Sequence, residues 1–418
     1  MASDRRRLLG NMASLFTLQG ANYALPLVTL PYLVRVLGPE KFGIIAFAQA
    51  FIQYFVVATD YGFNLSATRD VAVYREDSQK LGEIIGAVMA IKIALATAGA
   101  SLLALLILLV PTFRQHWPLY AVVYLTVVGA TFFPGWLFQG LERMRDITRM
   151  NIAARLLTTA AIFILIHNPN DYIVAAAIQS IPALLAAIPA WIVLRNMRDD
   201  IWQRPSLKII QRQIKGGWHL FLSSAAINIY TSSNTVVLGL LTNPIQVGYY
   251  SVANKIGGAI LGLYQPINQT IYPHISQLSA VSREQAISFI NNIYYKYVVS
   301  GAAITILVYF FSRQLVVIIA GMHYMDSIPI LETFAFLPFI LSFGHIYGGL
   351  TMLPLGMNRA FSRVVVTSML IDLISIYPLV QIYNAEGAAM ATILAEIVVS
   401  VLAFSYTRKY KVLSQGLV

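Results

Sequence analysis

Four basic side chains lie within stretches of the sequence that are otherwise apolar enough to cross a membrane: Lys92, Arg155, Lys255 and Lys296. A charge at the centre of a bilayer costs about 2.5–3.5 kcal/mol on insertion scales, so such residues normally face a bundle interior or a water-filled cavity. Cations in a low-dielectric cavity attract anions strongly, and a guanidinium can bind two phosphate oxygens at once. The four residues are therefore candidates for a cationic lumen that binds an anionic ligand. Alternatively, each of the four side chains could pair with an embedded acid, or could extend its charged end to the membrane surface.

Three acidic side chains also fall within apolar stretches: Asp60, Asp372 and Glu396. Each could bind a proton or Na⁺ and couple transport to an ion gradient, or could act as a structural counter-ion to the embedded cations. The sequence leaves both roles open. It contains no cysteine, which excludes thiolate metal sites and disulfides, and no other cofactor or metal site is expected.

Planar amides and aromatic rings are the side chains that bind sugars, through hydrogen bonds and apolar contacts. Candidates for contact with a glycan are Asn22, Tyr23, Asn64 and Gln139, together with Asn228 and Asn254. Most of the 23 tyrosines and 5 tryptophans are better explained as residues of the membrane interface.

The composition defines the class of protein. Of 418 residues, 58% are hydrophobic and only 11% are charged, whereas soluble domains carry about 25% charged residues. The chain is therefore predicted to be an all-α integral membrane protein, with about twelve spans. The approximate spans are residues 12–34, 42–63, 82–110, 119–140, 150–167, 171–194, 217–241, 248–272, 290–311, 328–352, 361–382 and 386–406.

The net charge of +11 reflects membrane topology. If the first span starts in the cytoplasm, all but eight of the 29 Lys and Arg residues lie on the cytoplasmic side, and four lie within spans. The remaining four are on the outer side: Arg35, Lys41, Arg114 and Arg313. Because cytoplasmic loops carry an excess of Lys and Arg, both termini are predicted to be cytoplasmic. This distribution argues against nucleic acid as the partner of the basic residues.

The second half of the chain shows signs of repeating the first. Pro39-x-x-x-Gly43 precedes the second span and Pro244-x-x-x-Gly248 the eighth, and Lys92 and Lys296 occupy the third and ninth spans at nearly the same offset. We therefore expect two six-helix parallel repeats around a central cavity, with halves at residues 1–200 and 201–418. Such duplication is typical of transporters.

Signatures of enzymes are missing from the sequence. There is no G-x-x-x-x-G-K-[ST], H-E-x-x-H or G-x-S-x-G motif, and the six histidines are scattered. We expect the chain not to be an enzyme. A membrane-embedded enzyme, such as a polymerase or a ligase, remains the alternative from another class, although it would need a sizeable outer loop, and the longest expected here covers only residues 312–327.

Several segments resemble the Wzx-type O-antigen flippases of the polysaccharide transport family, within the multidrug/oligosaccharidyl-lipid/polysaccharide exporter superfamily. The segments that carry the resemblance are Asn22–Glu40, Asp60–Thr68, Trp136–Gly140, Tyr250–Lys255 and Ile271–Ser276. It implies a flippase that moves undecaprenyl-pyrophosphate-linked oligosaccharide to the periplasmic leaflet of the bacterial inner membrane, through a cationic lumen between two six-helix halves. It also implies membrane lipid, an O-antigen polymerase and a chain-length regulator as partners. A multidrug-type, cation-coupled exporter of the same superfamily is the other transport alternative, although embedded acids would then be expected to outnumber embedded cations.

Overall fold

The computed structural model describes residues 2–197 and 203–409, without the side chains of residues 2–24, 197, 223, 230, 266 and 269. Throughout this described part the chain is helical and contains no strand, as expected for an all-α protein. It divides into two compact units, residues 1–232 and 233–418. The predicted boundary at residues 200 and 201 falls outside the described residues and stays a prediction.

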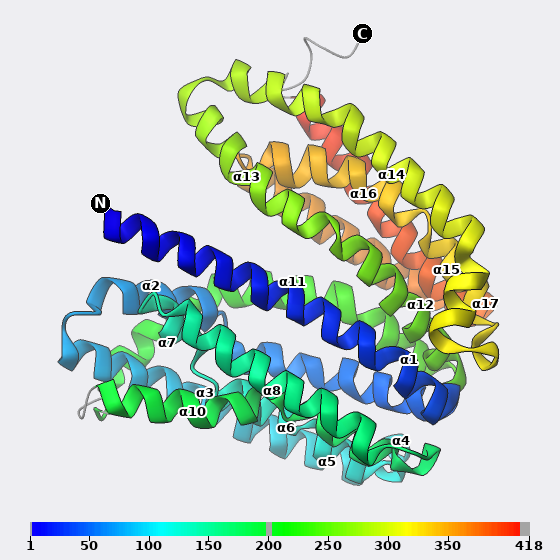
Figure 1. Ribbon diagram of the computed structural model, residues 1–418, viewed down its shortest axis with the longest axis horizontal. Coiled ribbons are helices and arrows are strands. Elements are labelled where there is room, and N and C mark those ends of the chain that lie inside the picture. The colour runs from blue at the N-terminus through cyan, green and yellow to red at the C-terminus, as the bar shows by residue number, and fades with distance from the viewer. Residues whose placement is uncertain (1, 198–202, 410–418) are drawn as a thin grey trace. The chain divides into compact units, whose positions relative to one another are not determined.

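Each unit is a bundle of long and short helices (Figure 1). Unit 1 contains α1 (Ala2–Asp60), α2 (Phe63–Tyr74), α3 (Ser78–Leu109), α4 (Pro111–Gln115), α5 (Trp117–Val123), α6 (Leu125–Phe132), α7 (Gly135–Gly140), α8 (Met144–Leu165), α9 (Tyr172–Ser180), α10 (Pro182–Met197) and most of α11 (Leu207–Leu241). Unit 2 contains the end of α11, α12 (Pro244–Gly262), α13 (Tyr264–Val281), α14 (Arg283–Ala320), α15 (Ser327–Phe334), α16 (Leu337–Gly344), the π-helix η3 (His345–Met352) and α17 (Asn358–Lys409). In unit 1, α8 lies along α1, and in unit 2, α14 lies along α16.

Among the described residues, eight helical stretches are long and apolar enough to cross a membrane. Two of them, Leu25–Tyr74 and Asn358–Lys409, are about twice the length that one crossing needs. Non-helical backbone at Gly38 divides α1 and at Asn384 divides α17, so each accommodates two of the predicted spans. The seventh and eighth predicted spans fall on α11, α12 and α13, which are helical but lie outside the eight stretches. The prediction of a polytopic helical membrane protein is confirmed.

The connection predicted at residues 312–327 is shorter than the sequence suggests. α14 continues to Ala320 and α15 begins at Ser327, so only residues 321–326 connect the two helices. Gly321, with φ +86°, ends α14 in a conformation that favours glycine. This connection is too short to hold a catalytic domain.

α3 and α14 start in the same way. The Asp77 side chain accepts a hydrogen bond from the backbone N–H of Lys80 (3.0 Å), and the Ser282 side chain accepts one from the N–H of Gln285 (3.3 Å). These bonds satisfy backbone donors that have no partner within the helix. The bond from Lys80 also holds the pKa of the Asp77 carboxyl below its usual range. The two caps are 205 residues apart, the same offset as Pro39 and Pro244.

Because the N-caps of α3 and α14 lie 205 residues apart, the residue of α14 that corresponds to Lys92 is not Lys296. Counted from the caps, Lys92 corresponds to Tyr297, one residue further along α14. Lys92 and Tyr297 are both buried, at 2% and 5% exposure, whereas Lys296 is exposed. The Tyr297 hydroxyl donates to Asn268 Oδ1 on α13 at 2.8 Å. Successive residues of a helix point about 100° apart. Because Lys296 lies one residue before the position that corresponds to Lys92, the two lysines occupy different faces of their helices.

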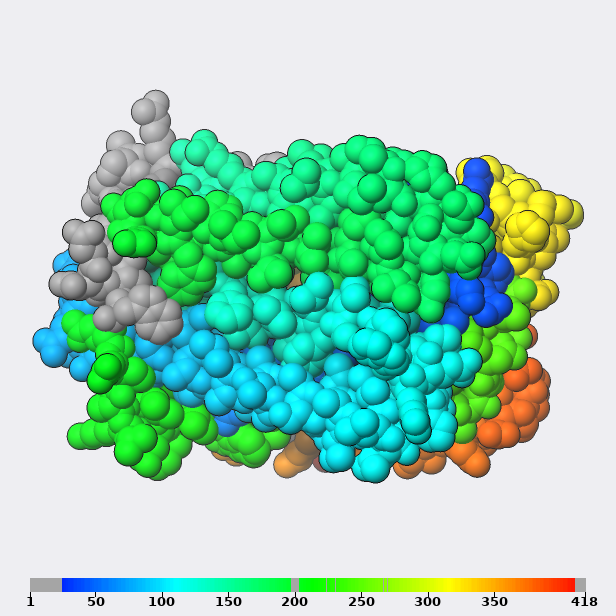
Figure 2. Space-filling view, turned by 90° about the horizontal axis from the view of Figure 1, so that it is seen from below, coloured from blue at the N-terminus to red at the C-terminus, as the bar shows by residue number. Residues whose placement is uncertain are grey.

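The core of unit 1 lies where α2, α3, α7 and α10 meet, around the fully buried side chains of Phe63, Val88, Trp136 and Phe138. Large apolar side chains, such as Leu102, Leu105 and Leu108, remain exposed on α3. α3 contacts α4 and α6 and appears in light blue on the face shown in Figure 2. An apolar outer face of this kind suits contact with lipid.

α2 and α7 approach each other closely at Gly140. A Cβ atom on this glycine would lie 2.8 Å from the backbone oxygen of Thr68 and 2.6 Å from Cβ of Val71. The Thr68 hydroxyl also donates to the backbone oxygen of Trp136 at 3.1 Å. Glycine at position 140 therefore permits the contact that fixes the start of α7.

Gly140→Ala should destabilise the protein by about 1–3 kcal/mol, because the added methyl group overpacks a backbone contact that cannot move aside. Thermal unfolding of the detergent-solubilised protein, followed by size-exclusion chromatography, measures the effect. Gly216→Ala is the matched control, since its Cβ would meet no atom within 4 Å and Gly216 lies within α11. We expect that control to be neutral or stabilising by up to about 1 kcal/mol. Equal unfolding temperatures for Gly140→Ala and the wild type would contradict the close contact.

Candidate functional site

One face of α1 and the start of α2 carry a row of polar side chains. Gln53, Asp60 and Asn64 recur at intervals of seven and four residues, with Val56 and Val57 between them. This spacing keeps the four residues from Gln53 to Asp60 on one side of α1, and Asn64 follows on the first turn of α2. All five line one cavity in unit 1.

The chain turns directly after Asp60. Tyr61 and Gly62 adopt left-handed backbone conformations with φ of +48° and +75°, and Gly62 is the N-cap of α2. Gly62 is also packed closely against α11, since a Cβ there would lie 2.8 Å from Cβ of Leu220. The Tyr61 ring stacks on Phe221 of the same helix, with the ring centroids 5.0 Å apart. These contacts fix the position of the Asp60 carboxylate at the end of α1.

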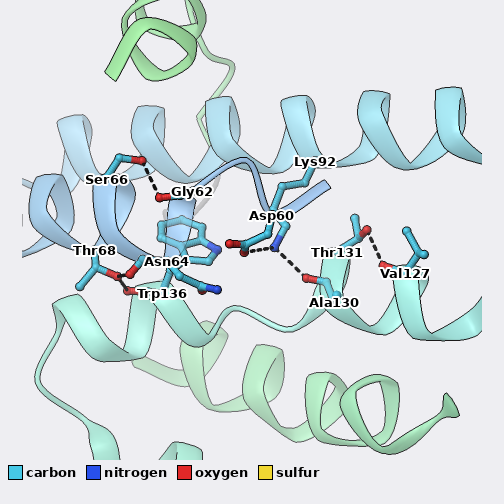
Figure 3. Close-up of polar contacts among 10 residues, drawn as sticks. All are labelled: Asp60, Gly62, Asn64, Ser66, Thr68, Lys92, Val127, Ala130, Thr131 and Trp136. Carbon is cyan, nitrogen blue, oxygen red and sulfur yellow. Dashed lines mark hydrogen bonds and ion pairs between the residues drawn. The ribbon is translucent and has the colours of Figure 1, made fainter. Parts of the chain in front are cut away.

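Lys92 is buried on α3 and links two neighbouring elements (Figure 3). Its Nζ donates a hydrogen bond to the backbone oxygen of Ala130 at 2.7 Å and lies 4.0 Å from Oδ1 of Asp60. The Asp60 side chain is 25% exposed, against 2% for Lys92. Of the three N–H groups of the ammonium, one is used by Ala130 and one is directed toward Asp60.

The sequence explains why Ala130 has a free carbonyl. In a continuous helix its oxygen would accept from the N–H of residue 134, but that residue is a proline, which has none. α6 ends at Phe132, where the N–H of Phe133 bonds to the oxygen of Gly129 at 2.9 Å. The ammonium of Lys92 replaces the missing donor and also places positive charge at the negative end of the helix dipole.

The cavity around these groups has a volume of about 450 Å³ and is lined by residues of α1, α2, α3, α6, α7, α10 and α11 and of the segment after α6. Its polar lining is Gln53, Asp60, Asn64, Lys92, Ser224 and Asn228, and its apolar lining is Val56, Val57, Ala130, Phe133, Gly135 and Ala183. Small-ligand pockets typically measure about 300–1,000 Å³. The cavity therefore has the size and the mixed lining of a binding site.

The other three embedded cations do not line this cavity. Arg155 is half-buried on α8, and among the described residues no hydrogen bond or ion pair of its guanidinium is recorded. Lys255 on α12 and Lys296 on α14 are exposed in unit 2. Each lies within a helix, as expected, but the structure does not bring the four cations together in one unit.

A second polar cluster lies in unit 2 around Asp372, which is completely buried on α17. The Asn234 amide donates to Asp372 Oδ1 at 3.3 Å and to the Thr392 hydroxyl at 2.7 Å. Asp372 Oδ2 and Asn234 Oδ1 are buried without any hydrogen-bond partner among the described residues. Two unsatisfied oxygens in the interior are costly unless a proton or a cation occupies the space between such groups.

The remaining sequence-predicted residues are less informative. Glu396 is half-buried on α17, and Gln139 is exposed at the end of α7, outside the cavity lining. Asn22 and Tyr23 belong to α1, but their side chains lie outside the described residues. Of the six candidates for glycan contact, the structure places Asn64 and Asn228 in the cavity.

Sequence reasoning did not select four polar residues that the structure places in these clusters: Gln53, Ser224, Asn234 and Thr392. A signal for Gln53 was present, because it lies seven residues before Asp60 on one helix face. Asn234 and Thr392 are 158 residues apart, and no local pattern connects them.

A helical membrane protein with a polar cavity and buried charges inside its spans has the architecture of a transporter. Solved structures share this fold: an inward-facing multidrug resistance MATE family transporter (TM-score 0.73, 13% identity, 94% of this chain and 96% of that one) and the lipid II flippase MurJ in an inward closed conformation (TM-score 0.70, 10% identity, 96% and 87%). Identities this low show the fold alone.

The family follows from the sequence comparisons. The family model described as "Polysaccharide biosynthesis protein" matches residues 8–279. A relative from Escherichia coli (strain K12), called "Putative O-antigen transporter", is 33% identical over 416 residues, which cover 99% of this chain and 100% of the relative. The chain therefore belongs to this family, as a Wzx-type flippase of the multidrug/oligosaccharidyl-lipid/polysaccharide exporter superfamily. The resemblance seen in the sequence is confirmed.

Proposed function

We propose that the chain moves undecaprenyl-pyrophosphate-linked O-antigen oligosaccharide from the cytoplasmic to the periplasmic leaflet of the bacterial inner membrane by alternating access. The observation that carries this proposal is a polar cavity with a fully buried lysine inside the helices of an O-antigen flippase family member. The polyprenyl tail stays in lipid while the headgroup and glycan cross. Both termini are cytoplasmic, and a polymerase and a chain-length regulator act on the product in the periplasm.

Embedded cations bind the anionic pyrophosphate in this mechanism. Arg155 is best suited to it, because its guanidinium offers a planar fork for phosphate oxygens and the described residues provide it with no partner. Lys255 and Lys296 are exposed and unpaired within the described part, so they can contribute positive potential along the path. Lys92 is already engaged by Asp60 and Ala130, which makes it the least free of the four.

Transport is coupled to an ion gradient at the Asp372 cluster. The cluster offers a carboxylate, an amide oxygen and a hydroxyl, all oxygen ligands, and two of these oxygens have no protein partner among the described residues. Oxygen ligands of this kind suit Na⁺, and a proton would equally satisfy the carboxylate. Asp60 lies 4.0 Å from the ammonium of Lys92, which supports a role as its counter-ion. Glu396 remains a further candidate for coupling.

The proposal is tested by the location of the lipid-linked oligosaccharide in cells. Deletion of the gene should leave the lipid-linked oligosaccharide on the cytoplasmic leaflet, inaccessible to a lectin added outside spheroplasts, and the intact gene should restore access. Unchanged access after deletion would rule out the proposed flippase activity.

Arg155→Ala should fold normally and reduce export about 10- to 100-fold, because a charge-assisted hydrogen bond to phosphate contributes about 1.5–3 kcal/mol. Export is measured as surface O-antigen in the deletion strain that expresses the variant at wild-type level. Arg149→Ala is the matched control, since it removes the same charge from an exposed position on α8. Equal export by the two variants would remove Arg155 from the binding path.

A further inference from the structure

The unit 1 cavity has the chemistry of a sugar site, which distinguishes it from a site for pyrophosphate. Its charged lining consists of one cation and one anion, Lys92 and Asp60, separated by 4.0 Å. The net charge of the lining is therefore zero, and the Asp60 carboxylate would repel a pyrophosphate placed beside it. An uncharged ligand meets no such repulsion.

The remaining polar lining can both donate and accept hydrogen bonds. Gln53, Asn64 and Asn228 each present an amide with two donor hydrogens and an acceptor oxygen, and Ser224 presents a hydroxyl that does both. Sugar hydroxyls also donate and accept, so they pair with such groups in either direction. Phosphate oxygens mainly accept, and would leave the acceptors of this lining unpaired.

Protein contacts orient the amides of Gln53 and Asn228 but leave hydrogen-bonding capacity for a ligand. Gln53 Nε2 contacts Asn228 Oδ1 at 3.5 Å, the outer limit of a hydrogen bond, so a ligand hydroxyl can readily replace this contact. The Asn228 amide also donates to the backbone oxygen of Ser224 at 2.9 Å, which orients the side chain on α11. The lining also includes apolar side chains, among them Phe133 and Val56, which suit contact with the C–H face of a sugar ring.

We infer that this cavity is the glycan-selecting site of the flippase, with Gln53, Asn228, Asn64 and Ser224 bonded to the hydroxyl groups of one or more sugar residues. The Lys92–Asp60 pair forms its charged end and adds a donor and an acceptor. The inference rests on the proposed function and deepens it, because it separates sugar recognition in this cavity from pyrophosphate binding by Arg155.

Binding to two lipid probes tests the assignment. The full chain in nanodiscs is titrated with lipid-linked oligosaccharide extracted from the deletion strain, and separately with undecaprenyl pyrophosphate that carries no sugar. Gln53→Leu and Asn228→Leu should each weaken binding of the glycan-bearing lipid by about 5- to 10-fold, the equivalent of one hydrogen bond of about 1–1.4 kcal/mol. Binding of the sugar-free lipid should remain at the wild-type level.

The matched control is Gln49→Leu. Gln49 lies one turn before Gln53 on α1 and makes a similar amide contact, to Gln179 at 3.4 Å, but it does not line the cavity. It should bind both lipids as the wild type does. If a leucine variant elutes as aggregate, Ser224→Ala removes one hydroxyl from the same cavity and should show the same selective loss.

Other results would overturn either the inference or the proposed function. Equal weakening for both lipids would assign the cavity to the headgroup and overturn the inference, and so would unchanged binding of both by all the cavity variants. If the wild type binds neither lipid, the proposed function itself fails.

Discussion

Lys92→Met should abolish glycan export and lower the free energy of unfolding by about 2–4 kcal/mol. The substitution leaves two groups without a partner: the Asp60 carboxylate, 4.0 Å from the lost ammonium, and the Ala130 oxygen, which Pro134 cannot serve. Breaking a buried ion pair by removing one partner costs about 3–5 kcal/mol, and the partial exposure of Asp60 reduces that figure. Thermal unfolding in detergent and surface O-antigen in the deletion strain measure the two effects.

A double variant separates the structural role of Lys92 from its role in the cavity. In Lys92→Met/Asp60→Asn the unpaired charge is removed, so about half or more of the lost stability should return. Export should still fail, because the charged end of the cavity is missing. Lys296→Met, at an exposed position, should change the free energy of unfolding by about 0.5 kcal/mol or less. Wild-type stability of Lys92→Met alone would show that the contacts of the ammonium contribute nothing to folding.

Asp372→Asn should also abolish export, but unlike Lys92→Met it should retain or increase the stability of the protein. Asparagine has nearly the same shape as aspartate and can keep the contact to Asn234, while it removes a carboxylate that is completely buried. Without the carboxylate the cluster cannot bind Na⁺ or a proton. Flipping of lipid-linked oligosaccharide in proteoliposomes, with an imposed Na⁺ or pH gradient, should respond to the gradient in the wild type and not in the variant.

The choice between the two ions follows from a stability measurement. A ligand that binds only the folded state raises its stability by about 2.7 kcal/mol at 100 times its dissociation constant. If Na⁺ binds at the cluster, replacing K⁺ by Na⁺ should raise the unfolding temperature of the wild type but not of Asp372→Asn. If the proton is the coupling ion, both proteins should respond to Na⁺ identically, and only the response to the pH gradient should differ. Gradient-driven flipping by Asp372→Asn equal to that of the wild type would contradict a coupling role.

The prediction of the fold from sequence succeeded because membrane insertion depends on local composition. A run of about 20 apolar residues is sufficient to predict a span, wherever the rest of the chain lies. The bends at Gly38 and Asn384 fall between predicted spans, where the apolar runs are interrupted. The sequence paired Lys92 with Lys296 as equivalent residues of the two halves, because both are lysines and lie 204 residues apart. The N-caps of α3 and α14 lie 205 residues apart, and this offset pairs Lys92 with Tyr297.

The candidate site could be predicted only in part. Lys92, Asp60 and Asn64 stand out in the sequence as polar residues in or beside apolar stretches, and they do line one cavity. Gln53 and Ser224 are unremarkable by type, and they belong to the site because α1 and α11 line the same cavity. Which helix faces meet is decided by packing between distant segments, which no single segment encodes.

By itself the sequence determined that this protein is a helical membrane protein, which family it belongs to, and which embedded charges need a partner. These properties follow from the energetics of single residues in a bilayer and from the order of motifs along the chain. Only the tertiary structure decided which groups become their partners. Lys92 contacts Asp60 and Ala130, and Asp372 accepts from Asn234, while one oxygen of each of these last two side chains has no partner among the described residues. The physical reason is that hydrogen bonds and ion pairs act over a few ångströms, so they depend on packing that brings together residues on different helices, here 32, 38 and 138 positions apart in the sequence.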